Sequence, residues 1–361
     1  MALTEAQTQN ILKTLVDPNT GKDFVTTRAV KNLKVASDQV SLEIELGYPG
    51  KSQFGPIRRM VTQALREAGA AKVSVDVRSK VVPHAVQRGV KLIPGIKNII
   101  AVASGKGGVG KSTTAVNLAL ALAAEGASVG MLDADIYGPS QPTMLGIVGR
   151  PESKDGKSLE PMEGHGVQAI SIGFLIDTDT PMVWRGPMVT QALEQLLRDT
   201  RWRDLDYLVV DLPPGTGDIQ LTLAQKVPVT GTLIVTTPQD IALIDARKGL
   251  KMFEKVGIPI LGVIENMAIH VCPQCGHESH IFGAGGADRI CQDYGTELLG
   301  QLPLDASIRE HADSGRPTVV ADPEGAVAEI YRRIARRCAV KIAETQKDMT
   351  AKFPNIVVQN T

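Results

Sequence analysis

Two kinds of hydrophobic spacing alternate in the first 80 residues. Apolar side chains recur at the spacing of a helix face over residues 11–16. Residues 40–46 and 72–77 alternate apolar and polar positions, which predicts two half-buried strands, and a further strand is expected near 30–35. A helix is predicted over 56–68, because a proline opens this stretch and a glycine follows it. The pattern indicates a small unit that mixes helices and strands.

From residue 99 onward the pattern changes to short, nearly continuous apolar runs separated by helical stretches. Strands are predicted at residues 99–103, 129–133, 167–172, 207–211, 232–236, 260–264 and 298–301. Helices are predicted at residues 112–124, 187–198, 219–226, 241–256, 287–294 and 323–346. Strands that are apolar on both faces and alternate with helices are typical of a mostly parallel sheet with helices on both faces. The expected fold class is therefore α/β, preceded by a small α+β unit.

The stretch between these two patterns reads as a linker. It contains two prolines and two glycines and shows no sustained period. A chain of 361 residues is also long enough for more than one domain, at roughly 100–200 residues each. We expect a small domain at residues 1–80, a linker at 81–97 and a larger α/β domain at 98–361.

Composition and charge exclude several functional classes. Lys plus Arg and Asp plus Glu both number 39, so the formal net charge is zero and a broad surface for nucleic-acid phosphates is not expected. Apolar runs such as 115–124 are too short to span a bilayer. The first ten residues lack the apolar core of a secretion signal. We expect a cytoplasmic protein with no nucleic-acid partner and no stable membrane association.

The most specific motif follows the first predicted strand of the larger domain. Residues 105–113 fit the phosphate-loop pattern of glycine, four residues and Gly-Lys-Ser, between an apolar strand and a helix. In this arrangement backbone N–H groups and the positive end of the helix surround phosphate oxygens. Lys111 is expected to contact the β- and γ-phosphates of ATP, and Ser112 to bind Mg²⁺. The predicted nucleotide-binding residues are Gly105, Gly107, Gly108, Val109, Gly110, Lys111, Ser112 and Thr113.

Three aspartates follow apolar strands, at the edge where ligands bind in open α/β sheets. Asp211 ends the strand 207–211 and, like a Walker B aspartate, is expected to hold Mg²⁺ directly or through water. Asp135 is the candidate for positioning the attacking water. Asp133 suits the same site or, equally, the cap of a turn or helix. Lys106 lies inside the loop, where a charge aimed at nucleotide phosphates and an ordinary solvated lysine are alternatives.

Two of the four cysteines form a close pair, Cys272 and Cys275, in a polar and irregular stretch after the strand 260–264. A C-x-x-C loop can bring two thiolates to one metal centre. Redox thiol chemistry is an alternative, but it favours a pair at the start of a helix. Pro273 and Gly276 give no clear helix start here.

Zinc is another possible occupant of this pair, since His277 and His280 lie nearby. A zinc finger, however, usually separates its ligand pairs by about a dozen residues. Two thiolates complete only half of a four-ligand site, and a second copy of the chain would complete it at a symmetric interface. Cys291 and Cys338 fall in predicted helices and are expected to be buried without a ligand role.

Taken together, these motifs resemble those of the Mrp/ApbC family of iron–sulfur carrier ATPases. The residues that carry the resemblance are 105–113, 133–140, 184–187, 211–218, 237–240, 265–267 and 272–275. The loop is similar to that of the deviant Walker A class, which includes MinD, ParA and the nitrogenase iron protein. In that class the early lysine acts across a nucleotide-sandwich dimer. Residues 1–80 resemble the PaaD-like domain that bacterial members often carry in front.

The resemblance implies a P-loop ATPase that forms a homodimer and uses ATP and Mg²⁺. It implies a labile [4Fe–4S] cluster held between two subunits by Cys272 and Cys275. It further implies that Asn266 contacts the adenine base and that Lys106 acts across the dimer. The implied partners are apo iron–sulfur proteins and assembly scaffolds, with a docking role for the N-terminal domain. Arg185 falls in a family motif, where a structural salt bridge is an equal interpretation.

Two other functions remain as alternatives. A MinD/ParA-like positioning ATPase would need a basic patch for DNA or an amphipathic membrane helix. The stretch 330–347 is partly basic, although most such helices present an ordinary solvated face. A zinc-binding P-loop regulator with little turnover is the third hypothesis.

Overall fold

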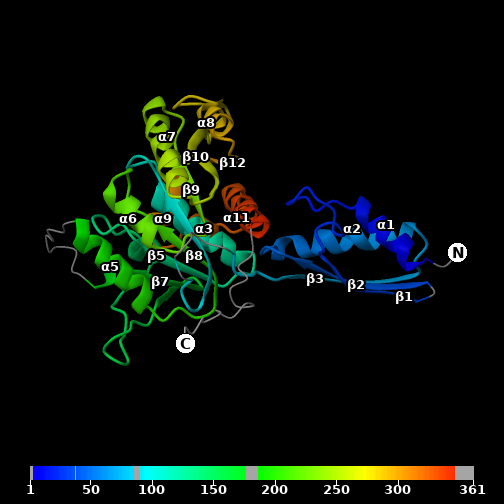
Figure 1. Cartoon of the computed structure of the whole chain (residues 1–361). Coiled ribbons are helices and arrows are strands. Elements are labelled where there is room, and N and C mark those ends of the chain that lie inside the picture. The colour runs from blue at the N-terminus through cyan, green and yellow to red at the C-terminus, as the bar shows by residue number, and fades with distance from the viewer. Residues whose placement is uncertain (1–2, 37, 85–89, 91, 176–185, 346–361) are drawn as a thin grey trace, which may run out of the picture.

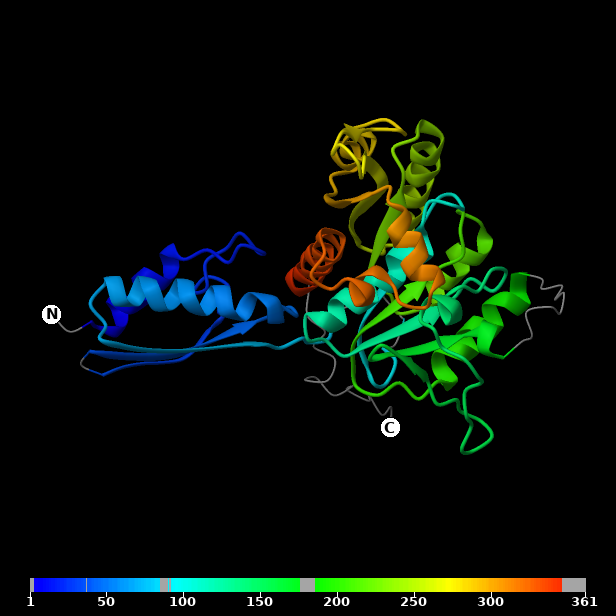
Figure 2. The same cartoon turned by 180° about the vertical axis from the view of Figure 1, so that it is seen from behind.

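The strands form two separate sheets in the computed structural model of the chain, which describes residues 3–36, 38–84, 90, 92–175 and 186–345. The N-terminal residues build the small sheet, which extends to one side of the molecule (Figure 1). The remaining residues build the large sheet and the helices around it. Figure 2 shows the same arrangement from behind, with the long C-terminal helix between the two parts.

The small sheet has the strand order β1-β2-β3 and is covered by two helices. Its elements are α1 (Glu5–Thr14), β1 (Val30–Ala36), β2 (Gln39–Leu46), η1 (Lys51–Gln53), α2 (Phe54–Glu67) and β3 (Lys72–Ser79). β1 and β2 are antiparallel, whereas β2 and β3 are parallel and are joined through α2, as a parallel pair requires. Leu12, Ile44, Val61 and Leu65 are completely buried between the helices and the sheet.

The large sheet has the order β11-β10-β9-β4-β8-β5-β7-β6, with β12 also paired to β10. Its strands are β4 (Ile96–Ala103), β5 (Val129–Asp133), β6 (Met162–Gly164), β7 (Val167–Ser171), β8 (Leu205–Asp211), β9 (Gly231–Thr236), β10 (Ile260–Val271), β11 (Glu278–Ser279) and β12 (Leu298–Pro303). The central strands are parallel, and the described antiparallel pairs, β6 with β7 and β10 with β11, lie at the edges. The carboxyl ends of β4, β5 and β8 therefore meet along one edge.

Helices α3 and α11 pack on each other and on the strands, while α7 packs on β9 and β10. The helices are α3 (Lys111–Ala124), α4 (Gln141–Met144), η2 (Ile172–Phe174), α5 (Gly186–Asp199), α6 (Asp218–Lys226), α7 (Asp240–Lys255), α8 (Gly286–Tyr294), α9 (Ala306–Asp313), α10 (Thr318–Ala321) and α11 (Ala326–Glu344). α3 is rich in Ala and Leu on every side and is buried almost throughout, as a helix between a sheet and a second helix should be. No helix in the described ranges is both long and apolar enough to cross a membrane.

The predicted mostly parallel α/β sheet, preceded by a small mixed unit, is confirmed. The predicted end of one strand at residue 264 is wrong, because β10 continues to Val271. Met267 has a φ of 57° and the pairing with β12 shifts register between Glu265 and Ile269, so an irregularity interrupts the strand without ending it. The sequence pattern also missed the short elements α4, β6, β11 and α9.

One buried ion pair within the large unit forms hydrogen bonds with the small unit. Arg336 of α11 donates to the Glu125 carboxylate at 2.6 Å, and the two side chains are 6% and 0% exposed. Ser52, which belongs to the small unit, donates its hydroxyl to the same carboxylate at 2.7 Å. Arg336 also donates to Asn19 at 3.2 Å. A single guanidinium thus ties α11, the end of α3 and two segments of the N-terminal unit together.

We expect Arg336→Ala to lower the free energy of unfolding by about 3–5 kcal/mol, because the change leaves the Glu125 carboxylate buried without its cation. Urea unfolding followed by circular dichroism measures the loss. The control is Lys22→Ala, which removes the exposed ion pair with Glu344 and should cost no more than about 1 kcal/mol. Equal losses for the two variants would show that the buried pair has no special role.

Candidate nucleotide site and thiolate pair

The loop between β4 and α3 requires glycine at two positions for different reasons. A Cβ added at Gly105 would lie 2.2 Å from the backbone carbonyl group of Asp245, which no side chain can avoid. Gly110 has a φ of 80°, and a Cβ there would lie 2.2 Å from the Nδ2 atom of Asn266. The loop is thus held between α7 and β10. It continues directly into the first turn of α3.

Lys111 lies at the centre of the candidate site. Its Nζ atom donates to the carboxylate of Asp211, at the end of β8, and to the Ser112 hydroxyl at 3.2 Å. The Lys111 and Asp211 side chains are 6% and 0% exposed. The structure therefore brings the three predicted residues together, with the lysine turned towards the carboxylate. A phosphate group that bound this loop would compete with Asp211 for the ammonium group.

Gln141 is a member of the site that the sequence pattern missed. It is buried at the start of α4, and its Nε2 atom donates to Asp211 Oδ2 at 2.9 Å and to the Ser112 carbonyl at 3.1 Å. Its Oε1 atom is buried and has no hydrogen-bond partner among the described residues. Gln141 thus fixes the carboxylate relative to the loop. Only its closeness in sequence to Asp133 and Asp135 signalled a role, and that signal is weak.

Asp133 lies directly beside Asp211, because β5 and β8 pair these two residues in register. Its carboxylate accepts hydrogen bonds from the N–H groups of Ser140 at 3.0 Å and Gln141 at 3.1 Å, and from the Ser171 hydroxyl at 3.0 Å. These contacts match the capping interpretation. Burial, reinforced by the negative charge of Asp211, raises the pKa of Asp133 to about 7.

The other two predicted catalytic residues are less buried than Lys111 and Asp211. Asp135 is half-buried, and burial raises its pKa, while the charge of Lys111 acts in the opposite direction. The Lys106 side chain is exposed, and its carbonyl group accepts a hydrogen bond from the Ser104 hydroxyl at 2.9 Å. Both assignments, to water positioning and to action across a dimer, stay predictions.

Asn266 belongs to β10 and contacts the phosphate loop directly. Its Nδ2 atom donates to the Val109 carbonyl at 2.9 Å. The amide therefore holds the loop in this structure, and its expected contact with adenine stays a prediction. Arg185 and Trp184, which the sequence pattern also singled out, lie outside the described residues.

The thiolate pair lies on the turn between β10 and β11. The Cys272 N–H donates to the His277 carbonyl and the Gly276 N–H donates to the Cys272 carbonyl, each at 2.9 Å. The N–H groups of Cys275 and Gln274, followed by the Cys275 thiol, donate to the Cys272 sulfur and lower its pKa. Cys275 itself is exposed. The turn thus favours the thiolate form of half-buried Cys272, beside the exposed Cys275.

The two remaining cysteines match their expected environment. Cys291 in α8 and Cys338 in α11 are both buried. Burial raises the pKa of the Cys291 thiol to about 11 and that of Cys338 to about 12. Within the described ranges, no group of three or more His, Cys, Asp or Glu side chains is arranged to hold a metal ion.

Comparison with known proteins assigns both parts of the chain to protein families. Residues 95–339 match the family model described as NUBPL iron-transfer P-loop NTPase, and residues 5–77 match the model of an iron–sulfur cluster assembly protein. An iron–sulfur cluster carrier protein of Pseudomonas fragi is 60% identical over 269 residues, which cover 74% of this chain and 94% of that protein. The protein of the same name in Escherichia coli is 51% identical over 327 residues, or 90% of this chain and 89% of that protein.

Among solved structures, a nucleotide-binding protein of Archaeoglobus fulgidus in complex with ADP has a similar fold. Its TM-score is 0.57 at 38% sequence identity, and the match covers 64% of this chain and 90% of that one.

We expect the stability of the protein to fall as the pH rises from about 4 to about 7. An unfolded aspartate loses its proton near pH ~4, whereas folded Asp133 keeps it up to about pH 7. Over this window the folded state binds the extra proton, so the free energy of unfolding decreases by about 1 kcal/mol per pH unit. Urea unfolding between pH 5 and pH 8 measures the slope.

The Asp133→Asn variant should flatten this dependence, because its amide is neutral throughout the range. Asp38→Asn, an exposed change in the turn between β1 and β2, serves as the control and should keep the slope of the wild type. A slope that is the same in all three proteins would contradict the assignment to Asp133.

Proposed function

The chain belongs to the NUBPL iron-transfer P-loop NTPase family, and from this premise we propose that it is an ATP-hydrolysing carrier of iron–sulfur clusters. The observation that carries the proposal is the pair formed by half-buried Cys272 and exposed Cys275, on the turn that follows the strand that contacts the phosphate loop. In this proposal a [4Fe–4S] cluster is the cargo, and apo iron–sulfur proteins of the cytoplasm receive it from the carrier. Assembly scaffolds supply it.

The nucleotide half of the proposal starts from the contact between Lys111 and Asp211. ATP binding places phosphate oxygens against the loop N–H groups and draws the Lys111 ammonium away from the carboxylate. Asp211 and Ser112 are then free to hold Mg²⁺, which neutralises charge on the phosphates when it is bound. Gln141 keeps the Asp211 carboxylate in place during this exchange, since it donates to the other carboxylate oxygen.

Asp135 is the proposed group that orients the attacking water. Its half-buried carboxyl lies on the open side of the site, and its pKa responds to the charge of Lys111. The exposed Lys106 is proposed to contact the nucleotide held by a second copy of the chain. This arrangement makes hydrolysis dependent on a dimer.

The cluster half of the proposal also requires two copies of the chain. A [4Fe–4S] cluster takes four thiolates, and each chain supplies the two on the β10–β11 turn. Three exposed isoleucines, between 54% and 65% exposed, offer apolar surface for the contact: Ile241 and Ile244 on α7, and Ile281 shortly before α8. Because α7 also packs against Gly105, such an interface would be continuous with the nucleotide site.

Strand β10 provides the proposed coupling between nucleotide and cluster. Asn266 holds the phosphate loop at one point of the strand, and Cys272 follows immediately after its end. The six residue steps from Asn266 to Cys272 span about 20 Å at most. A shift of the loop on ATP binding would act on Asn266 and, through the strand, on the turn that carries the thiolates.

We expect anaerobic reconstitution with iron and sulfide to give a protein with visible cluster absorbance and about one four-iron cluster for every two chains. Cys272→Ala and Cys275→Ala should each lose the absorbance, and analytical ultracentrifugation should show that the wild-type dimer is lost with the cluster. Cys291→Ala is the matched control, because this buried cysteine is not a proposed ligand.

Absorbance that survives in both single variants would refute the bridging cluster. A colourless wild-type protein with stoichiometric zinc would favour a zinc-binding regulator instead.

For the nucleotide site, we expect Lys111→Ala to weaken ATP binding by about 1.5–3 kcal/mol, or roughly 10- to 100-fold, because a charge-assisted contact is lost. Lys106→Ala should bind ATP normally but lose hydrolysis. Fluorescent-nucleotide titration and phosphate release measure the two effects separately. Normal hydrolysis by Lys106→Ala would contradict its role across the dimer, and normal binding by Lys111→Ala would contradict the loop assignment.

A further inference from the structure

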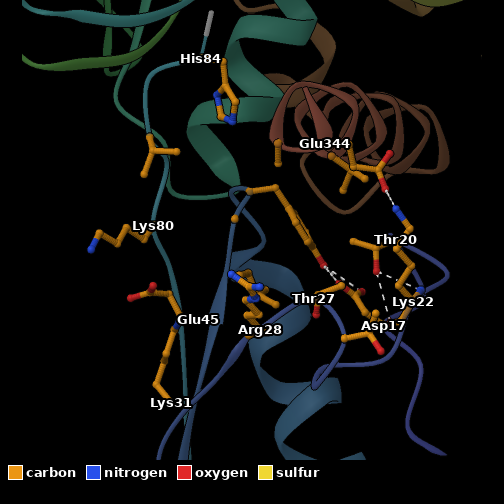
Figure 3. A pocket seen from close by; sticks show the side chains of 18 residues that line it. Asp17, Thr20, Lys22, Thr27, Arg28, Lys31, Glu45, Lys80, His84 and Glu344 are labelled. Atoms are coloured by element: carbon orange, nitrogen blue, oxygen red, sulfur yellow. Dashed lines mark hydrogen bonds and ion pairs between the residues drawn. The ribbon is translucent and has the colours of Figure 1, made fainter. Parts of the chain in front are cut away.

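A cavity of about 700 Å³ lies between the N-terminal unit and the end of α11 (Figure 3). Its walls come from the segment between α1 and β1, from β1 and β2, from the residues that follow β2 and β3 and from the end of α11. Its volume falls within the range of about 300–1,000 Å³ that is usual for small-molecule sites. It is separate from both the phosphate loop and the thiolate pair, since it contains no residue of either.

The acidic groups that line this cavity already have partners. The Asp17 carboxylate accepts hydrogen bonds from the Tyr48 hydroxyl at 2.9 and 2.8 Å. Glu344 is paired with Lys22 at 2.6 Å. Glu45 is paired with Arg78 at 3.0 Å. None of these carboxylates therefore calls for a cation in the cavity.

Three of the basic groups that line the cavity, unlike the carboxylates, have no partner among the described residues. The side chains of Arg28, Lys31 and Lys80 have no hydrogen bond or ion pair with any other described residue. Figure 3 shows Lys31 and Lys80 along the strand side of the cavity, whereas Glu344 and Lys22 lie on the other side. The negative end of α11 thus lies apart from Lys31 and Lys80.

The backbone that presents two of these cations is unusual. Arg28 has a φ of 58° and Asn32 a φ of 49°, a region that residues with a side chain seldom occupy. The pairing of β1 with β2 also shifts register between Lys31 and Lys34, which marks a bulge. Bulges of this kind redirect side chains and are frequent at functional sites. The strand therefore departs from regular geometry at the point where it lines the cavity.

We propose that this cavity binds a small multivalent anion, with phosphate or carboxylate groups, at the wall formed by Arg28, Lys31 and Lys80. Arg28 suits the role because its planar guanidinium binds phosphate and carboxylate groups through two parallel hydrogen bonds.

Isothermal titration calorimetry of the full-length protein with citrate and, separately, with inorganic phosphate tests the proposal and distinguishes the two chemistries. At least one anion should bind, and Arg28→Asn and Lys80→Gln should each weaken its binding about tenfold, equivalent to ~1.4 kcal/mol. Asparagine is chosen at Arg28 because it tolerates positive φ. Lys34→Gln is the matched control. This exposed lysine lies on β1, as Lys31 does, but outside the cavity, so its substitution should leave anion binding unchanged.

Three results would overturn the proposal. Neither anion binds the wild-type protein; or an anion binds with the same affinity in all variants, which places it elsewhere, for example at the phosphate loop; or a hexaglutamate peptide binds in a manner that depends on Arg28 while citrate and phosphate do not. The last result would assign the surface to an acidic protein segment instead.

Discussion

The large domain is organised around two carboxylates that the sheet brings side by side in its interior. Asp133 and Asp211 end adjacent parallel strands in register, and both are fully buried. Two such charges cannot share a buried site without compensation, so the surroundings supply it. Lys111 provides the cation, and the N–H groups of the chain before α4 bind Asp133. In the proposed function, Mg²⁺ takes the place of the Lys111 ammonium beside Asp211 once the nucleotide phosphates attract the lysine.

Much of this could be predicted from the sequence, because the phosphate loop depends on local chemistry. Strand, glycines, lysine and helix are consecutive, so the positions of Gly105 and Lys111 follow from spacing alone. The part played by Gln141 could not be predicted, since its contacts with Asp211 and Ser112 cross 70 and 29 residues of sequence. The extent of β10 was also missed, because Met267 adopts a positive φ that no residue pattern announced. Contacts that depend on tertiary packing produce no periodic pattern in the sequence.

The two cysteine environments show how the fold separates reactive from inert thiols. Cys338 lies within α11, where burial keeps its proton in place, whereas the turn after β10 offers N–H groups to the Cys272 sulfur. The sequence correctly predicted that Cys291 and Cys338 are buried, whereas the ligand role of the C-x-x-C pair stays a prediction. The cavity beside α11 had no such local signal, as its lining residues come from four distant segments.

The buried contact between Arg336 and Glu125 has a consequence for how separable the two parts of this chain are. Ser52 and Asn19 complete the hydrogen bonding of that ion pair from the N-terminal side. A fragment that began at residue 98 would keep both charges but would lose these two partners and open the pair to water. The N-terminal unit therefore supplies hydrogen bonds and burial that the charged pair of the larger domain needs. A shortened form would need compensating substitutions at the surface that the truncation exposes.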